Sequence, residues 1–190
     1  MLSSFLPFLI ALVAILIASL GLLVFFKICY VKVPQGSALI INDTGNEPKV
    51  SFTGALVLPV IHKAELMKLG LISLPVDRRG SEGLICKDNV RADITVTFYL
   101  RVNENPEDVL KAAKSIGVDR ASDSTAVGAL FKSKFAQAVM IAGKQFDLVE
   151  LFQEGLKFRE KVRELIGREL NGFVLEDVAV NYLEQASVKP

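Results

Sequence analysis

The chain begins with 26 residues that carry no charged side chain, and its first charge is Lys27. Residues 5–26 are almost all Leu, Ile, Val, Ala or Phe. They suit a helix roughly 33 Å long, against about 30 Å for the hydrocarbon core of a bilayer. A helix satisfies its own backbone hydrogen bonds, as lipid requires, so residues 1–29 are predicted to form a transmembrane anchor. The side chains expected in lipid are Phe5, Leu9, Leu12, Leu16, Leu20, Val24 and Phe26.

A cleaved secretory signal is the alternative interpretation of this stretch, and three features argue against it. No basic residue precedes the apolar run, the run is longer than that of a signal, and no small-residue cleavage site follows it. Lys27 and Lys32 come directly after the run. The positive-inside rule then predicts an amino terminus outside the cell and a cytoplasmic domain.

Residues 33–102 show the periodicity of β-strands. Ser37–Asn42 is a short run rich in β-branched residues, and the turn-forming residues 42–46 follow it. Residues 49–53 are therefore predicted to form the second strand of a hairpin.

The next segment, Gly54–Ile61, is apolar and uncharged throughout. It is either a buried strand or a loop or strand edge that lies in the membrane interface beside the anchor. Residues 66–76 then predict another strand, broken at Gly70. The candidate membrane-surface residues are Leu56, Val57, Leu58, Pro59, Val60 and Ile61.

The clearest strand pattern runs from Val90 to Val102, where seven apolar positions alternate with six polar ones. This alternation predicts an antiparallel strand with one buried side. The turn formed by residues 87–89 connects it to a shorter strand at residues 83–86. A sheet with one apolar face needs a cover, and the next part of the chain predicts helices.

The first predicted helix starts after Asn105, a favourable N-cap followed by Pro106, and stops at Gly117. The second runs from about Ser124 to Gly143, with apolar residues at steps of three and four.

A third helix is predicted from residue 148 towards residue 170, with a break at Gly155. Asp147 and Glu150 have the spacing of a capping box. Residues 173–184 close the pattern as a strand, in which the apolar parity shifts between residues 175 and 178 and predicts a bulge.

Charge and cysteine content narrow the class of protein. All 22 basic and 21 acidic residues lie beyond residue 26, so the domain has no basic excess suited to nucleic acid. Cys29 and Cys86 are the only cysteines, too few for a disulfide framework and consistent with a reducing compartment. Cys29 is expected at the bilayer edge, where it is either an acylation site or, as we favour, a small apolar residue at a helix end.

Catalytic patterns are absent from the sequence. His62 is the only histidine, so one chain cannot form a histidine metal cluster, and no Gly-x-Ser-x-Gly motif accompanies it. Gly80-Ser-Glu-Gly83 lacks the Lys-Ser/Thr of a phosphate-binding loop. The carboxylates of Glu176 and Asp177 are expected on opposite faces of a strand. We therefore expect no enzyme, no metal and no cofactor, and a structural or interfacial role for His62.

Two charged segments are candidates for contacts with lipid or with other subunits. Asp77-Arg78-Arg79-Gly80 is a compact basic turn that either is solvated or binds lipid phosphate or a neighbouring carboxylate. The third helix carries charges of alternating sign, which indicates a solvated face or lateral packing between subunits. Its candidate contact residues are Lys157, Glu160, Arg163, Glu164 and Arg168.

Taken together, several short motifs resemble the SPFH (Band 7) superfamily. They are Val33-Pro-Gln-Gly36, Gly54 with Pro59-Val-Ile-His62, Asp77-Arg-Arg79, Leu84-Ile-Cys-Lys-Asp-Asn-Val90 and Arg101-Val102. The run from Gly54 to Lys63 is most similar to the flotillin branch, which includes bacterial flotillin-like inner-membrane proteins. Residues 172–178 and 182–185 are similar to the strand that ends the family's domain. The resemblance covers about residues 30–186.

The resemblance implies an α+β fold in four parts. These are an anchor (1–29), a β-rich SPFH1 subdomain (30–104), a helix-rich SPFH2 subdomain (105–186), and the start of a carboxy-terminal region at residues 187–190. The family's first subdomain commonly lies on or partly in the membrane. Flotillins continue into a long Ala/Glu-rich coiled coil, which this chain lacks. We expect either a fragment, which we favour, or a protein without the usual cage wall.

For function, the resemblance implies a non-enzymatic scaffold in the inner (plasma) membrane. Its copies would form a large homo-oligomeric ring or cage on the lipid bilayer and organise a membrane microdomain with membrane-protein clients, such as NfeD-like proteins. The alternative within the superfamily is an accessory regulator of a membrane protease, with its domain outside the cytoplasm. A third and least favoured alternative is a membrane-bound hydrolase that uses His62.

Overall fold

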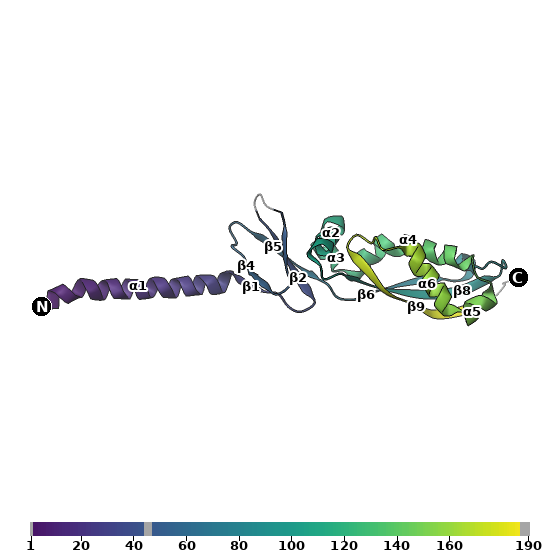
Figure 1. Cartoon of the computed structure of the whole chain (residues 1–190), viewed down its shortest axis with the longest axis horizontal. Helices are drawn as coiled ribbons and strands as arrows, with labels where there is room; N and C mark the ends of the chain where they lie inside the picture. Colours follow the sequence, from purple (N-terminus) through teal and green to yellow (C-terminus); the bar gives the residue numbers. More distant parts are fainter. Residues whose placement is uncertain (1, 44–46, 187–190) are drawn as a thin grey trace. The chain divides into compact units, whose positions relative to one another are not determined.

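The computed structural model describes residues 2–43 and 47–186, with side chains from Leu9 onward (Figure 1). The chain forms two compact units, Met1–Leu66 and Met67–Pro190. This division does not coincide with the expected boundary after residue 104. Residues 72–102 form strands of the same sheet as the closing strand, so they belong to the second unit.

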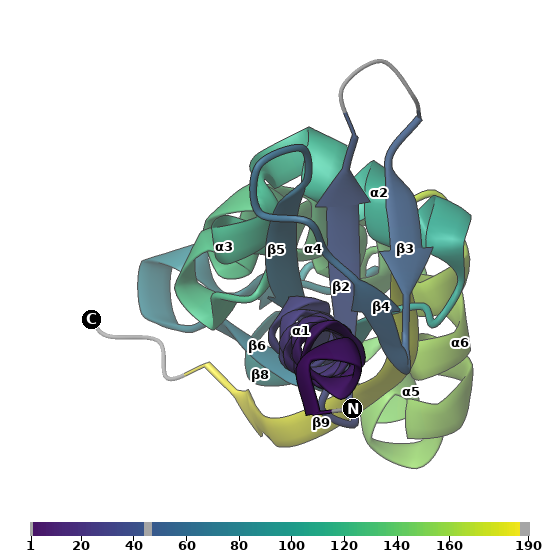
Figure 2. The same cartoon turned by 90° about the vertical axis from the view of Figure 1, so that its left-hand side faces the viewer.

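The first unit starts with the long apolar helix and continues into short strands. Its elements are α1 (Leu2–Cys29), β1 (Tyr30–Lys32), β2 (Ser37–Asn42), β3 (Lys49–Ser51), β4 (Gly54–Leu56) and most of β5 (Lys63–Lys68), whose last two residues are counted in the second unit. β1 pairs with β4, and β2 lies between β3 and β5 in a three-stranded sheet (Figure 2). The predicted hairpin is confirmed by the antiparallel pairing of Leu39 with Ser51 and of Ile41 with Lys49. Residues 44–46 of its predicted turn lie outside the described residues.

The core of the first unit forms around β2. Leu39, Ile41 and Val57 are buried, and the partly buried side chains packed against them are Val31, Val33, Ala55 and Ala64. Gly54 is needed where β4 crosses β1, because an added Cβ would lie 2.8 Å from the Tyr30 hydroxyl and 2.9 Å from the Val31 carbonyl oxygen. The small core leaves much of this unit's apolar surface exposed.

The second unit is a sheet centred on β8 (Arg91–Val102). β6 (Ile72–Arg78) and β7 (Leu84–Ile85) pair along one side of β8, and β9 (Phe173–Gln185) pairs along the other, all antiparallel. A 3₁₀ turn, η1 (Gly80–Glu82), connects β6 to β7. The prediction for β8 is confirmed, since its apolar positions from residue 92 to 102 are all at most 1% exposed.

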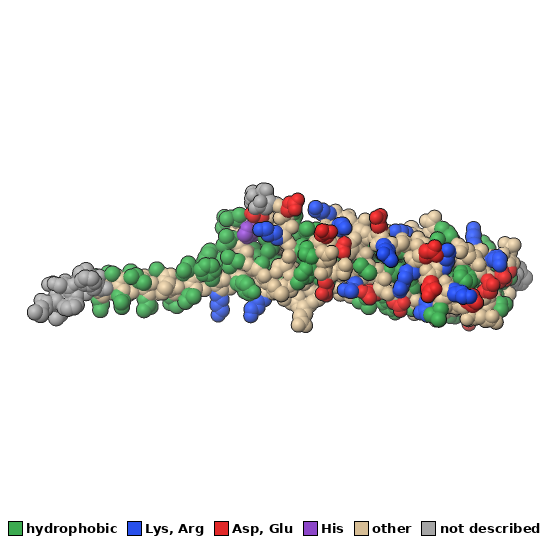
Figure 3. Space-filling model, in the orientation of Figure 1, with side chains coloured by type: hydrophobic (Ala, Val, Ile, Leu, Met, Phe, Trp, Pro, Cys, Tyr) green, Lys and Arg blue, Asp and Glu red, His purple; other side chains and the backbone are tan. Residues whose placement is uncertain are grey.

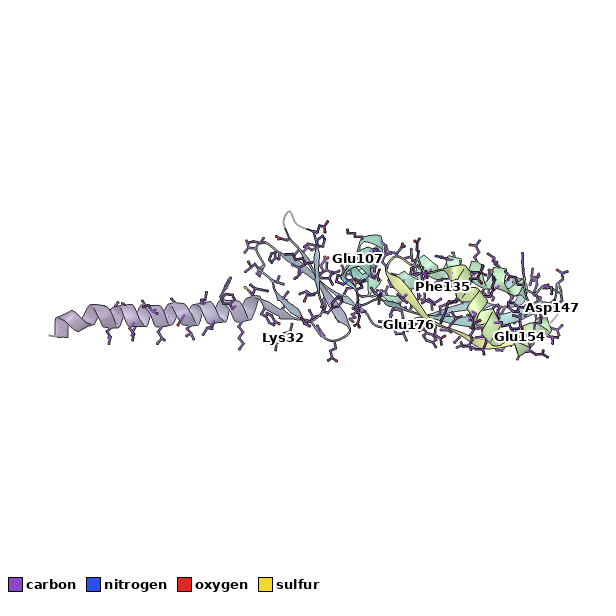
Figure 4. All side chains as sticks on the ribbon, in the orientation of Figure 1. Lys32, Glu107, Phe135, Asp147, Glu154 and Glu176 are labelled. Carbon is purple, nitrogen blue, oxygen red and sulfur yellow. The ribbon has the colours of Figure 1, made fainter. Side chains whose placement is uncertain are left out.

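Helices pack on the apolar face of this sheet (Figure 1). They are α2 (Pro106–Ile116), α3 (Val118–Ala121), α4 (Ser124–Gly143), α5 (Leu148–Gln153) and α6 (Gly155–Ile166). Phe135 of α4 lies between Phe98 of β8 and Phe131, with ring centroids 4.6 Å and 5.5 Å away. Figure 4 labels Phe135 within this unit. The ring of Phe173 meets Phe131 edge-on, so β9 shares the same aromatic core.

The helix signals are confirmed, with differences at some boundaries. Asn105 caps α2 by accepting the Glu107 N–H at 3.2 Å, and Asp147 and Glu150 form the predicted capping box. The predicted break at Gly155 separates α5 from α6. α6 ends before residue 170, because Gly167 adopts a left-handed backbone with φ of 75°. The short helix α3 was not predicted.

The strand predictions also differ in detail from the structure. The predicted break at Gly70 is confirmed, because residues 69–71 separate β5 from β6, but β5 starts earlier than expected, at Lys63. The predicted bulge in β9 is present, because Tyr99 pairs with Asp177 and Leu100 with Leu175. A second register shift, between Thr95 and Val96, was not predicted.

Candidate membrane-contacting and subunit-contacting surfaces

Helix α1 has the properties of a membrane span. Among the described residues, one helical stretch is long and apolar enough to cross a bilayer, Leu9–Cys29, with a mean hydropathy of 3.0. The Ser19 hydroxyl donates to the Leu16 carbonyl at 2.9 Å, so this polar group is satisfied within the helix. Figure 3 shows the apolar side chains around the helix. The expected lipid-facing residues Leu9, Leu12, Leu16, Leu20, Val24 and Phe26 are all exposed, whereas the side chain of Phe5 lies outside the described residues.

Cys29 ends α1 and is buried, with 3% of its surface exposed. Its carbonyl oxygen accepts the Val57 N–H at 2.7 Å, which joins the end of the helix to the apolar run. Burial of the side chain favours the interpretation of Cys29 as a small apolar residue over that of an acylation site.

The run Gly54–Ile61 is not a single buried strand, and its position in the membrane interface stays a prediction. Its first three residues form β4, and Val57 enters the core of the first unit with 7% exposure. The chain then turns, so that Val60 is 96% and Ile61 is 51% exposed. We call residues 58–62 the apolar tip.

Three hydrogen bonds at one residue hold the apolar tip. The Leu58 carbonyl accepts the N–H groups of Ile61 at 3.0 Å and His62 at 2.8 Å. The Leu58 N–H donates in turn to Nδ1 of His62 at 3.2 Å. Nε2 of His62 lies 3.7 Å from Oδ1 of Asp43. His62 thus has the structural role that was expected, and its partners are those of a turn rather than of a nucleophile.

Apolar side chains continue from the apolar tip onto the β1–β4 pair. Tyr30 and Leu56 lie opposite each other in the antiparallel register, and they are 49% and 43% exposed. Lys32, two residues after Tyr30, is exposed and labelled in Figure 4. A band of apolar residues beside the end of a membrane helix, with lysines next to it, has the composition of a membrane-interface segment.

The two arginines of the predicted basic turn are engaged within the fold. Arg78 ends β6, its side chain is 16% exposed, and it pairs with Glu82 at 3.2 Å. Arg79 pairs with Asp77 at 2.8 Å and lies over the ring of Tyr182, 4.4 Å from its centroid. Both arginines thus have partners within the fold, and their contact with lipid phosphate or a neighbouring carboxylate stays a prediction.

Charged side chains of α6 face β9 across a groove. Arg163 donates to the Glu176 carbonyl at 2.9 Å, and it lies 3.6 Å from the Asp177 carboxylate. Glu176 is the residue of the predicted bulge and pairs through its side chain with Arg101. Figure 4 labels Glu176 and Glu154 on this side of the second unit.

The groove has two hollows of about 690 Å³ each, and Arg163 lines the second of them. The first is mostly apolar and lies between α5, α6 and β9, with Leu156 and Val180 in its wall. Four of the seven residues that line the second hollow are charged. Its lining residues are Glu160, Arg163, Glu164, Gly167, Arg168, Val174 and Leu175.

The spacing of charges in the sequence predicts ion pairs of Glu160 with Arg163 and of Glu164 with Arg168 along α6, and the observed pairs are different. Lys157 pairs with Glu154 at 2.8 Å, which raises the pKa of the lysine, and Lys161 pairs with Glu164 at 2.9 Å. Glu160 and Arg168 have no ion-pair partner within the residues that the structure describes. Both side chains are therefore open to a neighbouring molecule.

Sequence reasoning missed one apolar patch on the second unit. Val149, Phe152 and Leu156 of α5 and α6 are 62%, 55% and 67% exposed. Val149 and Phe152 lie three positions apart on α5, and this helical spacing is the signal that could have identified them. Leu156 follows on α6, after the break at residue 154. Such exposed clusters mark contact surfaces more often than single exposed apolar residues do.

The described side chains offer no metal site, since no group of three His, Cys, Asp or Glu residues among them could hold an ion.

Comparison with known proteins identifies the family. The model of the SPFH domain / Band 7 family matches residues 31–186. The chain belongs to this family. Its SPFH domain thus starts in β1 and ends after β9, and it includes the apolar tip and the α6–β9 groove.

Two curated proteins with similar sequences carry flotillin names. The flotillin family inner membrane protein YqiK of Escherichia coli is 27% identical over 166 residues, which cover 86% of this chain and 30% of YqiK. The flotillin family inner membrane protein sll1021 of Synechocystis is 27% identical over 192 residues, which cover 97% of this chain and 28% of that protein. The SPFH chain therefore spans less than a third of the length of either relative.

Proposed function

We propose that this SPFH chain is a non-enzymatic membrane scaffold whose copies associate on the bilayer and organise a membrane microdomain with its client proteins. The observation that carries the proposal is the apolar tip, which presents Val60 and Ile61 to the outside, while the preceding residue, Val57, is hydrogen-bonded to the end of α1. Family membership and the names of the relatives agree with a membrane role.

The apolar tip gives the domain a second point of contact with lipid. Full transfer of an exposed Val or Ile side chain out of water is worth about 1.5–3 kcal/mol. That energy is too small for the tip to anchor the domain by itself. Because α1 already holds the chain in the bilayer, the local concentration of the tip at the membrane surface is high. The span and the apolar tip together would hold the first unit against the membrane surface.

A tryptophan reporter tests the membrane contact, because the chain contains no tryptophan. The full chain with Val60→Trp is placed in vesicles that contain brominated lipids. Contact predicts quenched, blue-shifted emission. Val149→Trp, on the exposed patch of α5, is the matched control and should remain unquenched. Equal emission from Val60→Trp with and without brominated lipids would contradict the contact.

Association of subunits is supported by the surface of the second unit. The apolar patch of Val149, Phe152 and Leu156 lies next to the groove, and Glu160 and Arg168 are available for intermolecular ion pairs. Buried apolar area supplies most of the affinity of an interface, and the charges set its register. We propose that neighbouring subunits pack against this part of α5 and α6.

Sizing of the full chain in mild detergent tests the association. A scaffold predicts a large, uniform assembly, and Phe152→Asp with Leu156→Asp should reduce it to small species. Val60→Asp, on the apolar tip, is the control that should leave the size unchanged. A monomer for the unaltered chain would overturn the proposed packing.

A further inference from the structure

We propose that His62 makes the apolar tip pH-dependent. In its neutral form, Nδ1 accepts the Leu58 N–H at 3.2 Å and closes the turn that presents Val60 and Ile61. Protonation of Nδ1 replaces this acceptor with a donor, which cannot accept the Leu58 N–H, and the turn loses one of its three hydrogen bonds. The proposal goes beyond membrane contact, because it concerns how that contact is regulated.

The geometry requires one tautomer of the neutral ring. Because the Leu58 N–H donates to Nδ1, the ring proton resides on Nε2. Nε2 points towards Oδ1 of Asp43, 3.7 Å away, and its proton suits an acceptor on that side. The His62 side chain is 22% exposed, so solvent protons reach the ring although it belongs to the turn.

The charged groups around the ring determine where it moves after protonation. Asp43, after β2, is the carboxylate that faces Nε2. On β5, the next element, Lys63 and Glu65 pair with each other at 2.6 Å. β3, on the far side of β2, carries Lys49. The imidazolium is therefore attracted to Asp43, away from the Leu58 N–H.

Loss of the His62 acceptor affects the exposed residues directly. Pro59, Val60 and Ile61 lie between the two residues that this hydrogen bond joins. A buried or half-buried N–H without a partner costs free energy until the backbone moves to reach water. The turn then opens, and the apolar side chains lose the fixed arrangement that suits insertion. Histidine is the side chain whose charge ordinarily changes between about pH 5 and pH 8.

Hydrogen–deuterium exchange of residues 57–62 in the full chain, in detergent, tests the proposal at about pH 7.5 and about pH 5.5. The unaltered chain and its variants are compared at the same pH, so the intrinsic exchange rate cancels. His62→Asn is the matched control, because its Oδ1 lies as many bonds from Cα as Nδ1 does, accepts a hydrogen bond and does not titrate. His62→Gln places its side-chain amide near the position of Nε2 but has no hydrogen-bond acceptor at the position of Nδ1.

The expected pattern separates the role of Nδ1 from general effects of acid. At about pH 5.5 the Leu58 amide should exchange about tenfold faster in the unaltered chain than in His62→Asn, the factor expected for one net hydrogen bond. At about pH 7.5 the Leu58 amide should exchange at the same rate in the unaltered chain and in His62→Asn. In His62→Gln the Leu58 amide should exchange fast at both pH values. Equal rates for the unaltered chain and His62→Asn at the lower pH would overturn the proposal, as would acid acceleration that persists in His62→Asn.

The fluorescence of Val60→Trp in vesicles distinguishes this proposal from the membrane contact on which its consequence rests. Quenching that is present at the higher pH and decreases at the lower pH supports both the membrane contact and its pH dependence. Quenching that is the same at both values retains the membrane contact and overturns the pH dependence. Absence of quenching at both values overturns the contact, and amide exchange then still decides whether His62 holds the turn.

Discussion

At the scale of single residues, Cys86 shows how burial determines the chemistry of a thiol in this domain. Its side chain is 2% exposed after β7, and its N–H donates to the Val90 carbonyl at 2.9 Å. Burial, with the nearby carboxylates of Asp88 and Asp147, raises the pKa of the Cys86 thiol to about 11. The thiolate is the reactive form, so Cys86 is a packing residue rather than a nucleophile.

We predict that Cys86 in the folded Cys29→Ala chain resists alkylation by iodoacetamide at neutral pH and reacts fully after unfolding. The raised folded-state pKa also means that the folded state holds the proton more tightly than the unfolded state. Stability from this group is present below about pH 9 and is lost as the pH rises towards about 11. Denaturant titrations across this pH range measure the decrease in the free energy of unfolding. Cys86→Ala is the control, in which this decrease should be absent. Fast alkylation of the folded chain would contradict the prediction.

At the scale of elements, helix boundaries follow local side-chain chemistry. Asp123 precedes α4, the longest helix of the second unit, and its two carboxylate oxygens accept the N–H groups of Thr125 at 3.1 Å and Ala126 at 3.2 Å. These are two of the donors that a helix start leaves without partners. Because α4 contributes Phe131 and Phe135 to the aromatic core, its start also sets the packing on β8.

Asp123→Ala is predicted to lower the free energy of unfolding by about 1 kcal/mol, because it removes an N-cap. Asp123→Asn retains an acceptor and should change stability by less than about half of that. Thermal unfolding of the full chain in detergent, followed by circular dichroism, measures both. An alanine variant as stable as the unaltered chain would show that water replaces the cap without cost.

At the scale of the whole molecule, the open question is on which side of the membrane the SPFH domain lies. α1 can cross the bilayer once, and the first charges after it are Lys27 and Lys32. Their position predicts that the domain lies in the cytoplasm. A scaffold for clients that are exposed to the cytoplasm requires a cytoplasmic SPFH domain. A regulator of a protease outside the cytoplasm would require the domain on the opposite side of the membrane.

Cysteine labelling of intact cells tests this orientation. Ser81→Cys, in the exposed 3₁₀ turn, is expected to resist a membrane-impermeant maleimide until the cells are permeabilised. Ser3→Cys, before the span, should be labelled from outside. The native cysteines are both buried, so they add little background. Labelling of Ser81→Cys in intact cells would reverse the orientation.

Much of the fold could be predicted because its signals are local. The length of the apolar run predicts α1, the alternation from residue 90 to 102 predicts β8, and the caps at Asn105 and Asp147 predict helix starts. Each signal depends on residues within a few positions of one another. The break at Gly155 and the bulge at Glu176 have the same local origin.

The candidate surfaces were only partly predictable, because local pattern does not determine burial. Val57 and Val60 lie in the same apolar run, yet Val57 packs with Leu39 and Ile41 while Val60 is 96% exposed. The exposed patch on α5 and α6 likewise depends on which face of each helix meets the sheet. These outcomes follow from contacts between residues far apart in the chain.

The sequence by itself thus determined the membrane helix, the strand and helix types, and the family resemblance. Apolar length, periodicity and capping act within a few residues, so they are readable without a fold. Only the tertiary structure decided that the chain divides at residue 66 and that His62 closes the turn at Leu58. It also decided that Arg163 reaches the bulge of β9. The physical reason is that strand pairing and side-chain hydrogen bonds depend on the three-dimensional path of the backbone, which no local pattern specifies.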